Sequence, residues 1–357
     1  MLIDGKPSRT IQEIDNYKLS IIDQTLLPHK LEYIALATLE DAFNAIKNMH
    51  VRGAPLIGIT AAYGMALAIR DDPSKQNINE AEKKLLNSRP TAVDLKWAVN
   101  RIKEKVINLN NNERFEAAWL LSGKLAEDSV FECSTIGDIG RDLILKEFKN
   151  RKNINILTHC NAGWLACVDW GTALSPIYKL FNEGVDIHVW VDETRPRSQG
   201  ALLTTWELTK HGVSNTLIVD NAGGHLMQEG KIDMCLVGSD RTTANGDVCN
   251  KIGTYLKALS AYDNNLPFYV ALPESTIDFS LRSGVNNIPI EERSSKEVSH
   301  VIGIDSKGSN AEIRISGEHT NIYNPGFDVT PNKYVTKLIT NKGVCEASKE
   351  GIDKLFK

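Results

Sequence analysis

The sequence has little that would direct the protein to a membrane or to nucleic acid. No apolar run approaches the roughly 18 to 20 residues that span a bilayer, and the first ten residues lack the apolar stretch of a signal peptide. Lys and Arg (41) nearly balance Asp and Glu (45), so no overall charge attracts polyanions. We therefore expect a cytoplasmic protein that binds neither membranes nor nucleic acid.

Short motifs for metals and nucleotides are also missing. The six cysteines form no CxxC pair, and no His stands beside them at zinc-ligand spacing. The sequence contains neither a Walker A motif nor GxGxxG, and no elbow motif indicates a Ser-His-Asp triad. Scattered thiols of this kind are typical of reduced, cytosolic proteins. We expect no metal and no cofactor.

The composition is that of an ordinary globular protein, with 42% hydrophobic and 24% charged residues in 357. This length is at the upper limit for one hydrophobic core, which predicts one large domain or two unequal domains. The hydrophobic pattern changes near residue 150. We predict an α/β protein, with a mainly helical domain and a small β element over 1–150, and a parallel-sheet domain over 151–357.

Apolar residues at helical spacing dominate the first part of the chain. Residues 17–27 alternate instead, which predicts a hairpin or an edge strand, and 71–80 and 108–112 are expected to be loops. The predicted helical stretches are 39–49, 57–69, 92–107, 113–132 and 136–148.

Short β-rich runs alternate with helical stretches after residue 151, which predicts a doubly wound parallel sheet. Ligands bind such sheets beyond the carboxyl ends of their strands. Ionisable or thiol side chains follow every predicted strand, so we expect one site there. The predicted strands are 154–159, 187–191, 216–219, 234–237 and 268–272.

A possible phosphate-binding segment stands directly before an Ala/Gly-rich helical stretch. Its sequence is Arg52-Gly53-Ala54-Pro55. Pro is favoured at the first position of a helix, and a helix N-terminus binds phosphate through free N–H groups and the helix dipole. Arg52 can add a charged fork. The alternative is an ordinary helix start with a surface arginine.

Cys160 follows a predicted strand and precedes Asn-Ala-Gly and an apolar stretch that we expect to be a helix. A thiol at a helix N-terminus is favoured as the thiolate. The alternative is a buried structural cysteine.

Asp240 and Arg241 follow the strand at 234–237, either as a catalytic acid with its neighbour or as a solvated ion pair. Asp247 is expected to cap a following helix, which would place Asn250 and Lys251 in its first turn. The weaker candidates for a catalytic role are His159, His225, Asp192 and Glu193.

Several of these segments together resemble the S-methyl-5-thioribose-1-phosphate isomerase family, which is related to the alpha, beta and delta subunits of translation initiation factor 2B. Examples are RGAPLIGITAAYGMALA, THCNAGWLACVDWGTALSPI and VGSDRTTANGDVCNKIGTY. The matching segments occur in order at 52–68, 88–99, 158–177, 192–208, 220–227, 237–255, 267–278, 288–293 and 324–331.

The resemblance implies roles for individual residues. The family's catalytic thiol falls on Cys160 and its catalytic acid on Asp240. The resemblance also implies a Rossmann-like second domain and a homodimer. The implied substrate contacts are Arg52, Gly53, Ala54, Arg89, Gln199, Asn250 and Lys251. Two residues depart from the family's usual pattern, namely Trp164 after Asn-Ala-Gly and Arg197 after DETRP. If they line the pocket, the substrate could carry a different substituent on C5 of its sugar.

The activity implied is a cofactor-free aldose–ketose isomerase of methionine salvage, which converts 5-methylthioribose 1-phosphate to 5-methylthioribulose 1-phosphate. Asp240 would donate to the ring oxygen if an apolar pocket kept it protonated. Hydrogen would then move from C2 to C1, through Cys160 or directly as hydride. The alternatives are isomerisation of 5-deoxyribose 1-phosphate or ribose 1,5-bisphosphate, and a non-catalytic subunit like those of translation initiation factor 2B.

Overall fold

The protein is described from a computed structural model, which describes residues 1–89 and 93–357. The chain divides into two compact units. Unit 1 comprises Met1–Asp138 and Ala162–Tyr178, and unit 2 comprises Ile139–Asn161 and Lys179–Lys357. Each unit has its own hydrophobic core. The predicted fold class, with helices first and a parallel sheet after them, is confirmed.

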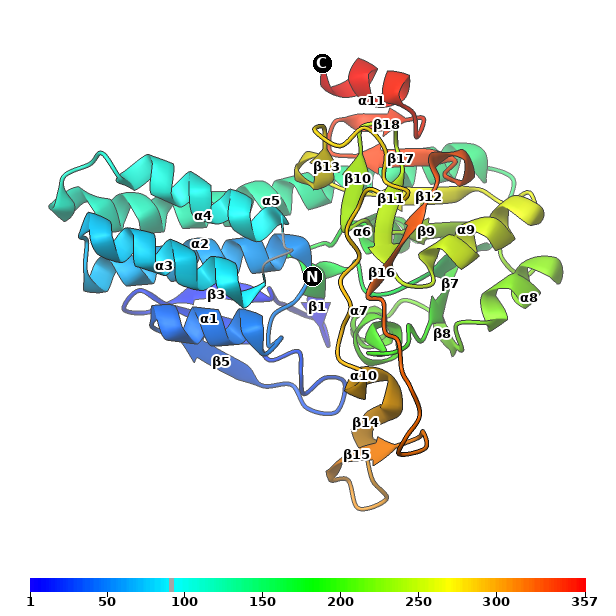
Figure 1. Cartoon of the computed structure of the whole chain (residues 1–357). Helices are drawn as coiled ribbons and strands as arrows, with labels where there is room; N and C mark the ends of the chain where they lie inside the picture. The colour runs from blue at the N-terminus through cyan, green and yellow to red at the C-terminus, as the bar shows by residue number, and fades with distance from the viewer. Residues whose placement is uncertain (90–92) are drawn as a thin grey trace. The chain divides into compact units, whose positions relative to one another are not determined.

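Helices make up most of unit 1 (Figure 1). The helices predicted at 39–49, 57–69 and 92–107 are confirmed to within a few residues, although residue 92 lies outside the described part of the chain. The helices are α1 (Leu39–Lys47), α2 (Ala54–Asp71), α3 (Lys75–Ser88), α4 (Val93–Val106) and α5 (Asn111–Glu147), of which α5 continues into unit 2.

Helix α2 is the centre of unit 1, because every residue from Leu56 to Ile69 is buried. A helix that is apolar on all sides must be surrounded, and α1, α3 and α4 pack around it. Gly64 permits the close approach of α1, since a Cβ there would lie 2.9 Å from the Cβ of Ala42. The Ala/Gly-rich sequence of α2 is therefore explained by helix packing.

Two predictions for this region are wrong. The expected loop at 71–80 contains the start of α3, where the Ser74 hydroxyl accepts the N–H of Asn77. Only Ile78 is buried within that window, so the helical spacing could not be recognised there. The two stretches at 113–132 and 136–148 form the single helix α5, because the polar residues between them do not interrupt its hydrogen bonds.

Unit 1 also contains two small antiparallel sheets. The predicted β segment at 17–27 forms the hairpin partner of β3 and is the central strand of its sheet, not an edge strand. The strands are β1 (Leu2–Ile3), β2 (Lys6–Pro7), β3 (Ile11–Ile14), β4 (Lys18–Ile22) and β5 (Tyr33–Leu36).

A seven-stranded sheet forms the centre of unit 2, in the order β18-β17-β12-β9-β6-β7-β8. All neighbouring strands are parallel except β18, which pairs antiparallel with β17 at one edge. The strands are β6 (Ile154–Thr158), β7 (Ile187–Asp192), β8 (Asn215–Ile218), β9 (Met234–Val237), β12 (Phe268–Ala271), β17 (Lys337–Thr340) and β18 (Gly343–Cys345).

All five predicted strands are confirmed. Strands buried on both faces, such as β9 and β12, have nearly continuous apolar sequences and are the easiest to recognise. Every residue of β9 and of β12 is buried. Strands β17 and β18 were not predicted. The helices and helical turns after β6 are η1 (Trp164–Ala166), α6 (Leu174–Asn182), η2 (Gly200–Thr204), α7 (Thr205–His211), α8 (Ala222–Gln228), α9 (Thr254–Asp263), η3 (Glu274–Thr276), α10 (Lys296–Ser299), η4 (Asn332–Tyr334) and α11 (Lys349–Phe356).

Two further β structures of unit 2 were not predicted from the sequence. One is a four-stranded sheet in the order β13-β10-β11-β16, and the other is the hairpin β14–β15, which extends away from the seven-stranded sheet (Figure 1). The strands are β10 (Arg241–Thr243), β11 (Val248–Lys251), β13 (Ile277–Asp278), β14 (His300–Ile304), β15 (Asn310–Arg314) and β16 (Phe327–Thr330).

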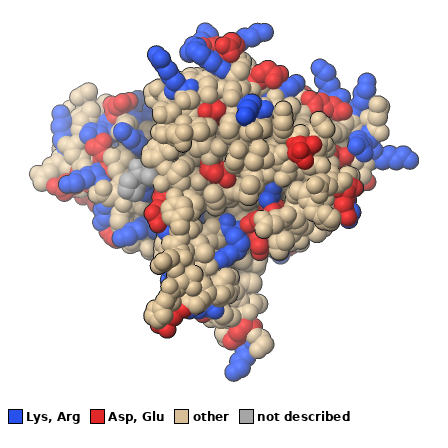
Figure 2. All heavy atoms as spheres, turned by 45° about the vertical axis from the view of Figure 1, so that its right-hand side comes forward, with Lys and Arg blue, Asp and Glu red and all other residues tan. Residues whose placement is uncertain are grey.

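The surface agrees with the nearly balanced composition. Lys and Arg are interspersed with Asp and Glu over the face seen in Figure 2. Within residues 1–89 and 93–357, no helix combines the length and the apolar character needed to cross a bilayer.

Candidate active site

The six parallel strands of unit 2 run in the order β8-β7-β6-β9-β12-β17, so the chain winds outward in both directions from the β6–β9 pair. In the register of this pair Leu157 lies beside Cys235. Cys160 follows β6 and Asp240 follows β9, both beyond the carboxyl ends of the strands. Ligands of doubly wound sheets bind at such a switch point. The topology of unit 2 thus places the two predicted catalytic residues at the edge where a ligand is expected.

Cys160 adopts a left-handed backbone conformation, with φ of 66°. Its N–H donates to Thr194 Oγ1 at 2.8 Å, and its carbonyl oxygen accepts from Thr204 Oγ1 at 2.7 Å. The helix that we expected directly after Asn161 is absent. The chain forms the short turn η1 instead, and α6 begins only at Leu174. The predicted support of a thiolate by that helix is therefore wrong.

Asp240 is exposed, and its N–H donates to the carbonyl oxygen of Cys249 at 3.0 Å. The apolar surroundings that the sequence argument required for its carboxyl group are thus not seen. The neighbouring Arg241 directs its guanidinium toward Asp278, with Nη1 4.0 Å from Oδ2. Arg241 therefore has a partner other than the expected Asp240.

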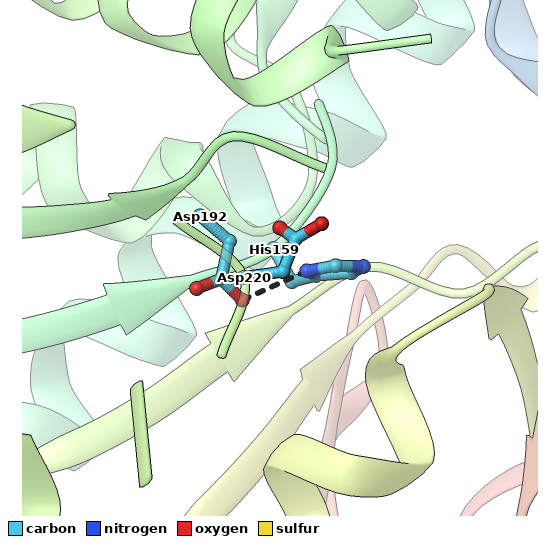
Figure 3. Close-up of side chains that lie close together, drawn as sticks. All are labelled: His159, Asp192 and Asp220. Carbon is cyan, nitrogen blue, oxygen red and sulfur yellow. Dashed lines mark hydrogen bonds and ion pairs between the residues drawn. The ribbon is translucent and has the colours of Figure 1, made fainter. Parts of the chain in front are cut away.

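His159 anchors the end of β6 directly before Cys160. Its Nδ1 lies 2.8 Å from Asp192 Oδ2, as Figure 3 shows, and its Nε2 lies 2.8 Å from the carbonyl oxygen of Ile252. A carbonyl oxygen only accepts, so Nε2 carries a hydrogen. Lys257 Nζ lies 3.2 Å from the same Asp192 oxygen, and the side chains of His159 and Asp192 are fully buried. Buried charges require such pairing, and this network ties β6 and β7 to the segment before α9.

His159, Asp192 and Asp220 place one possible ligand atom each within 4.8 Å of one another, which is a spacing suited to a metal ion. The two Asp220 oxygens, however, each accept a backbone N–H at 2.7 Å, from Thr194 and from Arg195. The Asp192 carboxylate is already paired with the Lys257 ammonium. A metal would have to displace the partners of Asp220 and of Asp192 Oδ2, whereas Asp192 Oδ1 is buried and has no hydrogen-bond partner among the described residues.

Gln199 is buried and stands at the start of η2, before Gly200. A Cβ on Gly200 would lie 1.7 Å from the carbonyl oxygen of Asp192, so only glycine allows this segment to lie against the end of β7. Among the described residues, no hydrogen-bond donor reaches Gln199 Oε1. A buried amide oxygen of this kind is suited to accept a hydrogen bond from a ligand.

Asn250 and Lys251 lie on strand β11, not in the first turn of a helix, and α9 begins only at Thr254. Asp247 does not cap a helix either, since its carboxylate accepts the N–H groups of Gly284 and Asn332. The pattern was misread because the polar residues after Asp240 turn the chain into a second sheet.

Lys251 is 8% exposed, its Nζ donates to the carbonyl oxygen of Gly326 at 2.8 Å, and it lies 4.4 Å from the centre of the Phe327 ring. Asp328 accepts the N–H groups of Gly253 and Tyr255 and so caps α9. Burial raises the pKa of Asp328 above its ordinary value, against the effect of these hydrogen bonds.

The other predicted substrate contacts belong to unit 1. Gly53 is the N-cap of α2 with φ of 92°, and a Cβ there would lie 2.4 Å from the carbonyl oxygen of Ala166. The predicted helix start after Arg52 is confirmed, with Ala54 as the first helical residue. Arg89 is the C-cap of α3, and residues 90–92 of the matching segment 88–99 lie outside the described chain.

The two unusual residues of the motifs have structural partners. Trp164 is fully buried in unit 1, and its carbonyl oxygen accepts from the Thr10 hydroxyl at 2.9 Å. Arg197 binds Glu297 of α10, with Nη1 3.0 Å from Oε1. Arg293 also binds Glu297, at 2.8 Å. Arg197 thus fastens the segment after DETRP to α10.

Replacing Glu297 by Gln should lower the midpoint of urea denaturation at pH 7. Burial alone would raise the pKa of Glu297, but hydrogen bonds from Arg293 and Arg197 outweigh it and lower the pKa to about 2. The ionised form of Glu297 therefore stabilises the fold at pH values above the ordinary pKa of a carboxyl group. This contribution to the free energy of unfolding, about 3 kcal/mol at most, is lost as the pH falls from about 4.5 toward 2.

Denaturation of the wild type and the Glu297→Gln variant at pH 7 and at pH 3 measures this contribution. The difference between the two proteins should be smaller at pH 3. The exposed Glu312 on β15, which binds Lys296 of α10, provides the control, and Glu312→Gln should leave the midpoint nearly unchanged. A difference for Glu297→Gln that is independent of pH would contradict the role of its charge.

Sequence reasoning missed four residues that shape this region. Thr194 and Thr204 bond to the backbone of Cys160, Lys257 binds Asp192, and Asp328 caps α9. Thr194 and Asp328 lie within the matching segments DETRP and NPGFDVTP, so their position was a signal. Lys257 carried no signal, because a lysine in α9 is usually exposed. His225, a weaker candidate, is 67% exposed on α8 beside Glu229, where it has no role in this arrangement.

The fold and this edge of the sheet define a doubly wound α/β protein with a thiol, a carboxylic acid and buried polar groups at the edge where ligands of such sheets bind. The chain belongs to the initiation factor 2 subunit family, which matches residues 50–347. A methylthioribose-1-phosphate isomerase from Methylobacterium nodulans is 53% identical and covers 100% of this chain and 98% of its own length.

Two solved structures are similar over nearly the whole chain. A 5-methylthioribose 1-phosphate isomerase from Pyrococcus horikoshii OT3 has a TM-score of 0.86 and 40% identity, and the match covers 98% of this chain and 96% of that one. A protein described as translation initiation factor eIF-2B, subunit delta, from A. fulgidus has a TM-score of 0.83 and 38% identity, with 98% and 99% covered.

Proposed function

We propose that the protein is an aldose–ketose isomerase of methionine salvage, which converts 5-methylthioribose 1-phosphate into 5-methylthioribulose 1-phosphate. The observation that carries this proposal is the position of Cys160 and Asp240 after the adjacent strands β6 and β9, where the sheet changes its winding direction. Relatives named for this activity match the whole chain at 53% identity.

The reaction needs an acid and a path for hydrogen. The substrate carries phosphate on its anomeric oxygen, so ring opening cannot release a free aldehyde. Asp240 donates a proton to the ring oxygen as its bond to C1 breaks. Hydrogen then moves from C2 to C1, and the C2 hydroxyl loses its proton to become the ketone. Asp240 is exposed in the protein alone, and we propose that the bound sugar covers its carboxyl group.

Several residues are proposed to bind the substrate. In unit 2, the buried Lys251 and Asn250 are suited to phosphate, and Gln199 Oε1 is suited to accept from a sugar hydroxyl. In unit 1, Arg52, Gly53 and Ala54 stand at the N-terminus of the 18-residue helix α2, an end that favours anions. Arg89 is proposed on its motif alone.

Replacing Lys251 by Met should raise KM about 10- to 100-fold, as expected for the loss of a hydrogen bond to a charged group. An ammonium carries three hydrogens, and the bond to Gly326 uses one of them. The methionine keeps most of the apolar stem and removes the ammonium group that lies 4.4 Å from the centre of the Phe327 ring. Steady-state kinetics, with the exposed Lys342→Met as control, measure the effect. An unchanged KM would contradict the phosphate role.

The function is tested by turnover of the purified protein on 5-methylthioribose 1-phosphate, 5-deoxyribose 1-phosphate and ribose 1,5-bisphosphate. We expect the first to give the highest kcat/KM. The assay is repeated after dialysis against EDTA, because full loss of activity restored by a divalent ion would assign a metal to His159, Asp192 and Asp220.

A non-catalytic role is the second candidate, because the A. fulgidus protein described as an initiation factor subunit is 38% identical. No turnover on any of the three sugar phosphates would favour it. The presence of both Cys160 and Asp240 at the switch point supports the isomerase instead.

We also propose that the protein acts in the cytoplasm as a homodimer, as the resemblance and the cysteine usage imply. The hairpin β14–β15 offers apolar side chains for such contact, since Ile302 is 71% and Ile313 is 57% exposed. Light scattering should give twice the chain mass of 39.6 kDa. A mass of one chain at micromolar concentration would contradict the dimer.

A further inference from the structure

The backbone of Cys160 is held in a conformation that its side chain disfavours. Its φ of 66° lies in the left-handed region, which is unfavourable for a residue other than glycine. Such a conformation persists only where the surroundings enforce it. Two threonine hydroxyls provide this restraint, one on each side of the residue.

The direction of each hydrogen bond follows from the partners. Thr194 Oγ1 accepts the N–H of Cys160, and its own hydrogen goes to the carbonyl oxygen of Asp192 at 3.0 Å. Thr204 Oγ1 donates to the carbonyl oxygen of Cys160 and accepts from Asn161 Nδ2 at 3.1 Å. Each hydroxyl therefore donates one hydrogen bond and accepts another, which fixes its orientation.

Both threonines are themselves held rigidly. Thr194 is fully buried and has φ of 64°, which is unusual for a β-branched residue, and its N–H donates to Asp220 at 2.7 Å. Thr204 is fully buried, and Asn161 also donates to the buried Glu207 at 2.6 Å. The restraint on Cys160 thus extends into the ends of β7 and η2.

We propose that Thr194 and Thr204 are positioning residues of the isomerase, whose hydroxyl groups hold Cys160 in the strained conformation needed for hydrogen transfer. The inference rests on the proposed function for its kinetic consequence. Small displacements of a reacting group have large effects on rate, up to about 100-fold for roughly 1 Å. The two hydroxyls would therefore act on kcat and not on substrate affinity.

The test replaces each threonine by Val, which keeps the shape and removes the hydroxyl, and by Ser, which keeps the hydroxyl. Val variants should lower kcat about 10- to 100-fold with KM changed less than about threefold, and Ser variants should recover most of kcat. Thr205→Val is the matched control, because the Thr205 hydroxyl bonds to Ala201 in the preceding turn and not to Cys160. Ala variants carry the same prediction if the Val variants fail to fold.

A second measurement does not depend on turnover. The rate at which iodoacetamide alkylates Cys160 is followed against pH by peptide mass spectrometry. The other thiols are poor competitors, since Cys133, Cys167, Cys235 and Cys249 are buried and burial raises the pKa of Cys345 to about 11. The profile should change in the Val variants and return in the Ser variants, even if no substrate is found.

Two results would overturn the proposal. One is a kcat within twofold of wild type in both Val variants with an unchanged alkylation profile. The other is a Ser variant as slow as its Val counterpart, because the hydroxyl would then not be the group that matters. Failure of the wild type to turn over any sugar phosphate would reject the proposed function but leave the alkylation result as a test of the restraint.

Discussion

Replacing Cys160 by Ser should lower kcat at least about 100-fold while the protein stays folded. Ser is nearly the same size, and its hydroxyl can adopt the same position, so the hydrogen bonds of the Cys160 backbone to Thr194 and Thr204 are retained. A hydroxyl is a far weaker acid than a thiol and is not ionised at neutral pH. The variant therefore separates the chemistry of sulfur from the geometry of the site.

Cys345→Ser is the control for this experiment, because Cys345 is a partly exposed thiol on the edge strand β18. It should retain wild-type kcat. Thermal denaturation of both variants shows whether the fold is kept. Near wild-type turnover in Cys160→Ser would remove the thiol from the reaction.

The role of the thiol is resolved by the fate of deuterium placed at C2 of the substrate. If Cys160 carries the hydrogen, part of the label should exchange with water before it reaches C1. Full retention over many turnovers would assign a direct hydride shift, with Cys160 orienting the substrate. No helix begins directly after Asn161, so a helix dipole cannot favour a thiolate at Cys160. The isotope experiment therefore distinguishes transfer through Cys160 from a direct hydride shift.

Replacing Asp240 by Asn should also lower kcat at least about 100-fold, with a smaller effect on KM. The amide keeps the size of the side chain but cannot transfer a proton to the ring oxygen. The hydrogen bond from the Asp240 N–H to the carbonyl oxygen of Cys249 does not involve the side chain, so the segment after β9 should keep its conformation. The loss should therefore come from the missing acid.

The pH dependence gives the second part of this prediction. A general acid must be protonated to act, so activity falls as it ionises and its limb lies on the alkaline side of the profile. In the wild type the alkaline limb of kcat/KM reports groups of the free enzyme, and that of kcat reports the complex. If the bound sugar shields Asp240, its protonation should be seen in kcat, and the Asn variant should lack that limb. Asp263→Asn, on an exposed carboxylate at the end of α9, is the control. Full activity of Asp240→Asn would reject the assigned role.

Much of unit 2 follows from local sequence. Strands such as β9 and β12 are buried on both faces, so they are continuous apolar runs that can be recognised without knowing their neighbours. The polar residues after them had to gather at one edge, because the carboxyl ends of parallel strands lie together. Cys160 and Asp240 could be found for this reason, and the family resemblance then gave them roles.

Tertiary structure alone decided the order of the strands and the setting of the site. The pairing of β6 with β9 joins residues 78 apart, as Thr158 and Leu236 show, and no local pattern encodes such a partner. The second sheet, with Lys251 on β11, was misread as a helix because its partner β16 begins at Phe327, far along the chain. The strained conformation of Cys160 likewise depends on Thr194 and Thr204, which lie 34 and 44 residues away. Local propensity determines which segments form helices and strands, but hydrogen bonds between distant segments exist only once the chain has folded, and here they set the geometry of the thiol.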